Sequence, residues 1–280
     1  MAVSKFGFPR WNFQYEIDGA TTLDPVKDYN LLRRIAGRKK LFMDPLCASG
    51  FLKGKHVLDL GSNAGYWSYV ALTEGGAAHV TGIEASPEIT RQAEFVFKAK
   101  GIDRSSYTFS CRGAYGFLEE TTEPFDAILC LGFFYHIHDP FQLLRLMHKA
   151  VRDFVVIDTI VHKSDDALIS VRPVIKGKAT VEEAAMSLEL VSSRKAIFWM
   201  AEETGYREAR LLTDQYEKIS SMWDYIAGQR ECLVLSKERP VHTVWRNAVD
   251  PSYLTIPEDF RKYGYFPEMH RKGGRADAIS

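Results

Sequence analysis

The chain has 280 residues, 46% of them hydrophobic and 26% charged, which is enough to bury the core of one large domain. Its 36 basic and 36 acidic side chains balance, so the chain has no net positive charge that would attract nucleic acid. The sequence still allows a local basic patch. No apolar run is long enough to span a membrane and the first ten residues lack a signal-peptide core, so we expect a cytoplasmic protein.

Residues 1–50 are expected to form an N-terminal cap or substrate segment. Three aromatic residues, Trp11, Phe13 and Tyr15, alternate along it, and the basic residues 33–34 and 38–40 follow. The aromatic side chains could form a lid over a site, a contact in a homodimer or a wrap over the core, and the sequence leaves these alternatives open. The basic residues could hold a phosphate or carboxylate of a substrate, or be solvated.

Residues 56–66, His-Val-Leu-Asp-Leu-Gly-Ser-Asn-Ala-Gly-Tyr, combine a short apolar strand, a glycine turn and the start of a helix. The apolar residues within 57–60 are typical of a parallel strand covered on both faces. Gly61 and Gly65 allow backbone conformations that a side chain would obstruct. The first turn of the following helix then offers free N–H groups to a ligand, so we predict a nucleotide-binding hinge.

A second strand is predicted over residues 77–84, and it ends in the carboxylate of Glu84, which is placed to bind the two hydroxyls of a ribose. The hinge suits either a dinucleotide or S-adenosylmethionine. In a dinucleotide fingerprint Asn63 would crowd the diphosphate, and Tyr66 would prevent close packing of helix and strand. The charge of Asp59 would repel pyrophosphate and suits the cationic amino acid end of S-adenosylmethionine.

The turn resembles the loop after the first strand of class I S-adenosylmethionine-dependent methyltransferases, which carries an acid-x-Gly-x-Gly-x-Gly pattern. Asp59, Gly61 and Gly65 match this pattern, and Asn63 replaces the middle glycine. The resemblance implies that residues 61–65 cradle the methionine portion. The residues that we assign to the cofactor site are Asp59, Gly61, Ser62, Asn63, Gly65, Glu84, Ala85, Gly113, Ala114, Leu131 and Gly132.

The third strand is predicted over residues 107–112. The family often binds the adenine amine with an Asp after this strand, but this chain has Arg112 there, and a guanidinium cannot accept that hydrogen bond. Backbone atoms near Gly113 and Ala114 would therefore have to bind the base.

Residues 125–131 are predicted to form a central strand, and an aromatic and histidine-rich loop follows it. In open α/β sheets ligands lie beyond the carboxyl ends of the strands, so this loop should adjoin the hinge. We therefore expect Tyr135, His136 and His138 to face the methyl group or its acceptor.

This loop and residues 11–21 near the N-terminus also resemble the tRNA wobble-uridine carboxymethyltransferases, which carry a similar Gly-x-x-Tyr-His turn. Enzymes of that subgroup hold the carboxylate of carboxy-S-adenosylmethionine, which requires an additional cation. Arg112 and Arg91 are candidates for this cation, and the sequence selects neither.

Methyl transfer is an in-line displacement on a sulfonium, so it needs alignment and, for a hydroxyl acceptor, a base. His136 or His138 is the candidate base, and His136 is preferred because it immediately follows the tyrosine of the turn. Either histidine could instead orient the loop. Tyr135 could bound the methyl pocket or bind the acceptor. Asp139 is predicted to cap a helix that begins at Pro140.

A divalent metal bound by His136, His138, Asp158 and His162 is an alternative to a base mechanism. These residues have no paired helical spacing, and Gly132 stands where a carboxylate would naturally close the fourth strand. We therefore predict no metal site.

Strand and helix patterns alternate from residue 56 onward, which predicts an α/β fold with a Rossmann-like, mostly parallel sheet of seven strands and helices on both faces. The last three strands are expected at 153–160, near 209–213 and at 230–237, and by resemblance the final strand lies antiparallel between the other two. The methyltransferase domain is predicted to span 51–237, with an insertion at 161–192 that contains a helix-like stretch at 181–188. Residues 238–280 are predicted to form a C-terminal extension.

We predict an S-adenosylmethionine-dependent methyltransferase that acts on a small molecule, at oxygen and with a histidine base. The alternative is a tRNA-modifying methyl- or carboxymethyltransferase. An oxidoreductase, or a catalytically silent protein that retains the cofactor fold, would be a third and a fourth interpretation.

Overall fold

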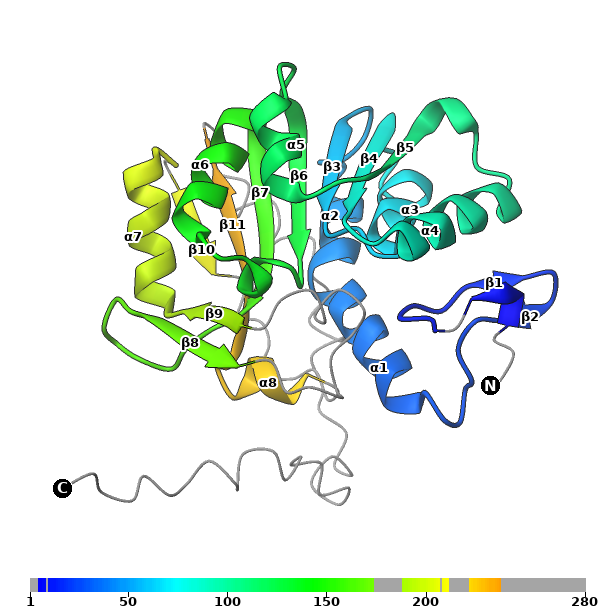
Figure 1. The fold of residues 1–280 in the computed structure, drawn as a ribbon, viewed down its shortest axis with the longest axis horizontal. Coiled ribbons are helices and arrows are strands. Elements are labelled where there is room, and N and C mark those ends of the chain that lie inside the picture. The colour runs from blue at the N-terminus through cyan, green and yellow to red at the C-terminus, as the bar shows by residue number, and fades with distance from the viewer. Residues whose placement is uncertain (1–4, 9, 174–187, 207, 212–221, 238–280) are drawn as a thin grey trace.

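The computed structural model describes residues 5–8, 10–173, 188–206, 208–211 and 222–237 (Figure 1). At its centre lies a seven-stranded sheet in the order β10-β11-β7-β6-β3-β4-β5. Its strands are β3 (His56–Leu60), β4 (His79–Glu84), β5 (Tyr107–Cys111), β6 (Phe125–Leu131), β7 (Val151–Ile160), β10 (Glu208–Leu211) and β11 (Arg230–Ser236).

Five neighbouring strands of this sheet, β5, β4, β3, β6 and β7, run parallel to one another. Strand β11 lies between β7 and β10 and runs antiparallel to both. The central strands are covered on both faces, so residues 57–60 of β3 are at most 1% exposed. This double burial explains why the strand has an almost continuous apolar sequence.

Helices cover both faces of the sheet, as predicted (Figure 1). Because side chains alternate along a strand, Val57 and Leu129 pack into one core cluster while Leu58 and Ile128 pack into the other. Helices α3 (Tyr66–Thr73) and α4 (Pro87–Ala99) cover the first face, and α5 (Ala114–Glu120), α6 (Pro140–Ala150) and α7 (Arg194–Thr204) cover the second. The α/β, Rossmann-like fold predicted from the sequence is confirmed.

The start of α6 follows the prediction in detail. The Asp139 carboxylate accepts a hydrogen bond from the backbone N–H of Gln142 at 2.9 Å, and Pro140 is the first helical residue. A side-chain cap and a proline at the first position together fix where the helix begins. The loop between β6 and α6 is therefore fixed at one end by the sheet and at the other by the capped start of the helix.

The described part of the chain also contains elements outside the central sheet and the helices named above. They are η1 (Lys5–Gly7), β1 (Glu16–Ile17), β2 (Ala20–Thr21), α1 (Tyr29–Arg38), η2 (Lys39–Met43), α2 (Asp44–Ala48), η3 (Arg104–Ser106), η4 (Phe134–His136), β8 (Ile169–Pro173), β9 (Leu188–Ser192) and α8 (Trp223–Ile226). Figure 1 shows α1, α8 and the β8–β9 hairpin beyond the end of the sheet toward which the arrowhead of β6 points, which is the carboxyl edge of the parallel strands.

Parts of three sequence predictions lie outside the described residues: 181–187 of the helix-like stretch, 212–213 of the sixth strand, and the whole extension 238–280. The last residue of the helix-like stretch, Leu188, is not helical but begins β9. Within the described ranges, no helix has the length and apolar character needed to cross a membrane.

Candidate active site

A cavity of about 920 Å³ opens at the carboxyl edge of the sheet. Its wall is formed by the glycine turn after β3, the ends of β4 and β6, the start of α5, and residues of the N-terminal segment, α1, α8 and β11. Twelve residues assigned from the sequence line it: Gly61, Ser62, Asn63, Glu84, Ala85, Gly113, Ala114, Leu131, Gly132, Tyr135, His136 and His138. Asp59 and Gly65 lie beside the cavity without lining it.

The glycine turn has the left-handed backbone that the sequence suggested. Gly61 has a φ of 68°, and a Cβ atom placed there would lie 2.7 Å from the Phe133 ring, so this position has no room for a side chain. The backbone N–H groups of Gly61 and Ser62 both donate to the carbonyl of Ile83, at 2.9 and 3.0 Å. The turn is thereby fixed to the end of β4, next to Glu84.

Glu84 is 5% exposed and connects two loops of the cavity wall. One carboxylate oxygen accepts a hydrogen bond from the backbone N–H of Asn63 at 3.2 Å, and the other accepts one from the N–H of Ser86 at 2.8 Å. Each carboxylate oxygen accepts from a different loop, so these contacts orient the group in the cavity wall.

Asp59, which we assign to the cofactor site, does not line the cavity, and one of its oxygens contacts α3. Its Oδ2 accepts hydrogen bonds from the backbone N–H and the hydroxyl of Ser68, at 3.1 and 2.7 Å. Burial raises the pKa of Asp59 to about 6, while the bonds from Ser68 act in the opposite direction. The side chain therefore fixes the first turn of α3, and its charge acts on the cavity from behind the glycine turn.

The loop after β6 brings the three predicted catalytic side chains to the cavity. Gly132 has a φ of 88° and donates its N–H to the carbonyl of Asp158 at 2.8 Å, which turns the chain into η4. The rings of Tyr135 and His136 lie 4.0 Å apart between centroids. The Nδ1 atom of His136 lies 3.8 Å from Oε1 of Glu189 in β9, whereas His138 is exposed.

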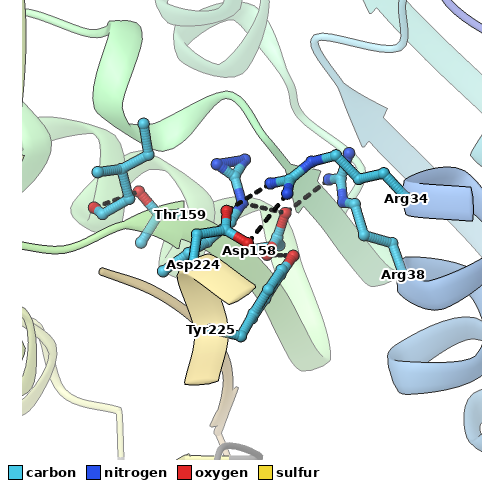
Figure 2. Close-up of polar contacts among 8 residues, drawn as sticks. Arg34, Arg38, Asp158, Thr159, Asp224 and Tyr225 are labelled. Carbon is cyan, nitrogen blue, oxygen red and sulfur yellow. Dashed lines mark hydrogen bonds and ion pairs between the residues drawn. The ribbon is translucent and has the colours of Figure 1, made fainter. Parts of the chain in front are cut away.

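A network of arginine and aspartate side chains forms one end of the cavity, and the sequence prediction missed its organisation (Figure 2). Arg38 of α1 contacts Oδ2 of Asp158 at 2.6 Å, and Nε of Arg230 contacts the same oxygen at 3.3 Å. The hydroxyl of Tyr225 donates to Oδ1 of Asp158 at 2.5 Å. Burial alone would raise the pKa of Asp158, but Arg230 and Arg38 hold it below its ordinary value.

A second ion pair extends this network toward α8. Arg34 of α1 donates two hydrogen bonds to Asp224, at 2.9 and 2.6 Å, in the bidentate geometry that a guanidinium favours (Figure 2). The guanidinium nitrogens of Arg38 and Arg230 also lie 3.3 and 3.4 Å from the position that a Cβ atom on Gly132 would take. Glycine at this position therefore lets two cations approach the end of β6.

Two sequence signals could have located this network. The sequence places a basic run at 38–40, and an antiparallel final strand brings its first residue, Arg230, opposite Ile160 at the end of β7. The isolated residues do not reveal which acid neutralises which arginine, because that depends on the docking of α1 and α8.

The structure gives Asp158 a role other than the metal ligand considered from the sequence. Its two oxygens accept from two arginines and a tyrosine, so the group is already neutralised. Across the described ranges, no group of three or more His, Cys, Asp or Glu side chains has the arrangement of a metal site.

The two arginines named as candidates for a cofactor carboxylate are not the best placed. Arg112 lines the cavity but pairs with Glu120 at 2.6 Å, and Arg91 is exposed and does not line it. Arg38 and Arg230, by contrast, line the cavity and are largely buried.

Three buried polar atoms of residues in the cavity wall have no hydrogen-bond partner in the described part of the chain: Nε of Arg38, Oγ of Ser62 and Nε1 of Trp67. Buried polar groups without partners are rare in native proteins because each costs desolvation energy. All three residues line the cavity, so a polar ligand bound there could supply the missing partners.

Comparisons with known proteins agree with this geometry. Relatives at low identity are the tRNA U34 carboxymethyltransferases of Helicobacter pylori: the protein of strain G27 is 28% identical over 185 residues, covering 64% of this chain and 67% of the relative. The protein of strain ATCC 700392 / 26695 is 27% identical over 200 residues, covering 69% and 72%.

Among solved structures, the N-terminal domain of EvdMO1 with SAH bound has a TM-score of 0.54 at 19% identity, covering 81% of this chain and 90% of that one. Magnesium protoporphyrin IX methyltransferase from Synechocystis PCC 6803 with bound SAM has a TM-score of 0.51 at 13% identity, covering 75% and 85%. At these identities the likeness supports the fold. The family model described as a methyltransferase domain matches residues 51–212, more than half of the chain, and the protein therefore belongs to this methyltransferase domain family.

Proposed function

We propose that the protein binds S-adenosylmethionine in the cavity at the carboxyl edge and transfers its methyl group to a small acceptor. The observation that carries this proposal is the position of Glu84, whose carboxylate lies in the cavity wall beside the turn of residues 61–65. An acid at the end of the second strand suits the hydroxyls of a ribose. Two of the structural neighbours hold SAH or SAM, which supports the same cofactor here.

The cavity has room for a second molecule beside the cofactor. Its volume of about 920 Å³ is near the upper end of ordinary ligand sites. We place the methionine portion at residues 61–63, the ribose at Glu84 and Ala85, and the adenine at Gly113 and Ala114. The acceptor then lies toward Tyr135 and the arginine network.

The charge at that end of the cavity favours an acceptor that carries a carboxylate or phosphate. Within the described residues, the three arginines of the network form ion pairs with two aspartates, Asp158 and Asp224, so this cluster carries one excess positive charge. Arg38 and Arg230 share one oxygen of Asp158, which leaves each guanidinium with further N–H groups to donate. An anionic group on the acceptor would bind there in a partly dry site, where charge-assisted hydrogen bonds are strong.

For the reaction itself we propose methyl transfer to a hydroxyl oxygen, with His136 or His138 as the base. Both histidines line the cavity on the side of the loop after β6. Most of the rate enhancement comes from holding the acceptor oxygen in line with the methyl group and the sulfonium sulfur. Removal of the hydroxyl proton by an imidazole increases the rate further.

Carboxymethyl transfer to tRNA is the second candidate function, and the arginine pair Arg38 and Arg230 supports it. The H. pylori relatives are named for that activity. Arg38 and Arg230 could bind the carboxylate of a carboxylated cofactor instead of one on the acceptor.

Calorimetric titration of the protein with S-adenosylhomocysteine, run beside NAD, tests the cofactor assignment. We expect binding of S-adenosylhomocysteine alone, with an affinity in the micromolar range. Binding of NAD alone would overturn the proposal and return the hinge to the dinucleotide alternative.

Transfer from methyl-labelled S-adenosylmethionine and from carboxy-S-adenosylmethionine, each offered to a panel of hydroxy acids, to sugar phosphates and to unmodified tRNA, then separates the two candidates. Label on an acidic small molecule supports the first. Label on tRNA from the carboxylated donor supports the second.

A further inference from the structure

The β8–β9 hairpin brings a carboxylate to the candidate base. We propose that Glu189 is a positioning residue, which orients the imidazole of His136 and stabilises its charge after it takes the acceptor proton. This inference rests on the proposed function and selects His136 over His138. It assigns a catalytic contribution to the insertion after β7, which the sequence identified only as an added segment.

The hairpin holds Glu189 on a fixed element. Residues of β9 pair in register with β8, where Glu189 lies opposite Arg172. At its base the hydroxyl of Ser193 donates to the carbonyl of Asp166 at 2.6 Å and accepts from the N–H of Leu168 at 3.2 Å. The N–H of His162, just after β7, donates to the carbonyl of Ser192 at 3.0 Å, so the hairpin is tied to the sheet.

The two side chains form a largely buried pair. The distance between Nδ1 of His136 and Oε1 of Glu189 is 3.8 Å, and their side chains are only 15% and 19% exposed. At this separation a carboxylate and an imidazolium attract each other, and partial burial reduces screening by solvent. In the part of the chain that the structure describes, no acidic side chain makes an ion pair with His138.

The ring of Tyr135 contacts both His136 and Arg230. Its centroid lies 4.0 Å from that of His136, and the guanidinium of Arg230 lies 5.3 Å from it. Burial raises the pKa of the Tyr135 phenol, Arg230 and Arg38 lower it, and Glu189 and Asp158 raise it. The candidate base and the arginine network therefore meet at one tyrosine, with the carboxylate of Glu189 beside the base.

The acceptor hydroxyl gives its proton to Nε2 of His136, its oxygen bonds to the methyl carbon, and the bond from that carbon to the sulfonium sulfur breaks. S-adenosylhomocysteine leaves with the electron pair of that bond. The proton stays on the imidazole, with Nδ1–H directed to Glu189, until it passes to water.

The tautomer of His136 can be observed without a known acceptor. We would record long-range proton–nitrogen NMR spectra of the full chain, labelled with 15N-histidine and saturated with S-adenosylhomocysteine, and identify His136 by the signals lost in His136→Asn. We expect the proton of neutral His136 on Nδ1 in the wild type and in Glu189→Asp. In Glu189→Met, which removes the carboxylate but keeps a side chain of similar length, this preference should be lost.

Glu203→Met is the matched control, because Glu203 is exposed on α7. It should leave the His136 signals and S-adenosylhomocysteine affinity unchanged. With an acceptor from the transfer panel, Glu189→Met should lower kcat about 10- to 100-fold with unchanged cofactor affinity, and Glu189→Asp should recover part of the loss.

Unchanged His136 signals and kcat in Glu189→Met, with normal binding of S-adenosylhomocysteine, would overturn this inference alone. Failure of the wild-type protein to bind S-adenosylhomocysteine would overturn the proposed function and this inference with it.

Discussion

At the scale of single residues, Glu84 has a structural role, and we propose that it also binds the cofactor. Its oxygens hold the N–H groups of Asn63 and Ser86, and the proposed function adds the ribose. We expect Glu84→Ala to weaken binding of S-adenosylhomocysteine by roughly 1.5 to 3 kcal/mol, the range for losing a charged hydrogen-bond partner. Calorimetry gives this difference directly.

The control for Glu84 is Glu88→Ala, which removes a carboxylate from the first turn of α4 outside the cavity wall. It should leave the affinity within about 0.5 kcal/mol of the wild type, as surface substitutions usually do. Equal affinities for wild type and Glu84→Ala would show that the ribose assignment is wrong.

Asp59 makes stability depend on pH. Burial raises its pKa to about 6, so between about pH 4 and pH 6 the folded protein keeps a proton that the unfolded chain has released. Stability from this group is therefore present at low pH and is lost as pH rises through this window, by about 3 kcal/mol at most.

Asp59→Asn removes this dependence, because the amide carries no charge and its oxygen can still accept from Ser68. We expect the unfolding free energy of the variant, relative to wild type, to rise by up to about 3 kcal/mol from pH 4 to pH 7. Urea unfolding of both proteins at several pH values measures it. A difference that stays constant with pH would contradict the burial of an ionised carboxylate.

At the scale of elements, the N-terminal segment is bound to the glycine turn. The buried hydroxyl of Tyr15 donates to the carbonyl of Ala64 at 2.8 Å, and the ring of Phe13 stacks on Tyr66 with centroids 4.9 Å apart. Nearer the start of the segment, Nε2 of Gln92 donates to the carbonyl of Arg10, and Arg10 lines the cavity. This segment therefore forms part of the cavity wall.

Tyr15→Phe should lower the unfolding free energy by about 1 to 2 kcal/mol, because it leaves a buried carbonyl without its donor while the ring still packs. We also expect weaker binding of S-adenosylhomocysteine, since the carbonyl belongs to the turn that we assign to the cofactor. Tyr29→Phe is the control, at an exposed tyrosine of the same segment. If both variants unfold at the same urea concentration, the segment does not stabilise the turn through this bond.

The sheet was the most predictable part of this molecule because each strand and helix cap is indicated by residues that are neighbours in the sequence. Strand β6 begins and ends where the sequence indicates, and Asp139 caps α6 as expected. The β8–β9 hairpin was not predicted because its exposed apolar residues, such as Val171, give no pattern of burial. For the same reason the contact between Glu189 and His136, which joins an insertion to a core loop, could not be derived from spacing.

At the scale of the whole molecule, Asp158 joins segments that are far apart in the sequence. Arg38 of α1 and Tyr225 of α8 contact this one buried carboxylate (Figure 2). Arg230 of β11 contacts it as well. The sequence showed each of these residues but not their convergence, because it depends on long-range packing. The network links the N-terminal segment and the last strand to the centre of the sheet.

Asp158→Asn should therefore lower the unfolding free energy by about 3 to 5 kcal/mol, because two buried arginines lose their counter-charge. Asp153→Asn on the same strand removes a more exposed partner, that of Lys55, and should cost about 1 kcal/mol or less. Adding Arg230→Met to Asp158→Asn should recover part of the loss, since one uncompensated charge is removed as well. If urea unfolding gives equal losses for the two aspartates, the network does not stabilise the fold. A larger loss at Asp158, partly recovered in the double variant, would mean that the fold carries two buried cations at the cavity only because this aspartate compensates them.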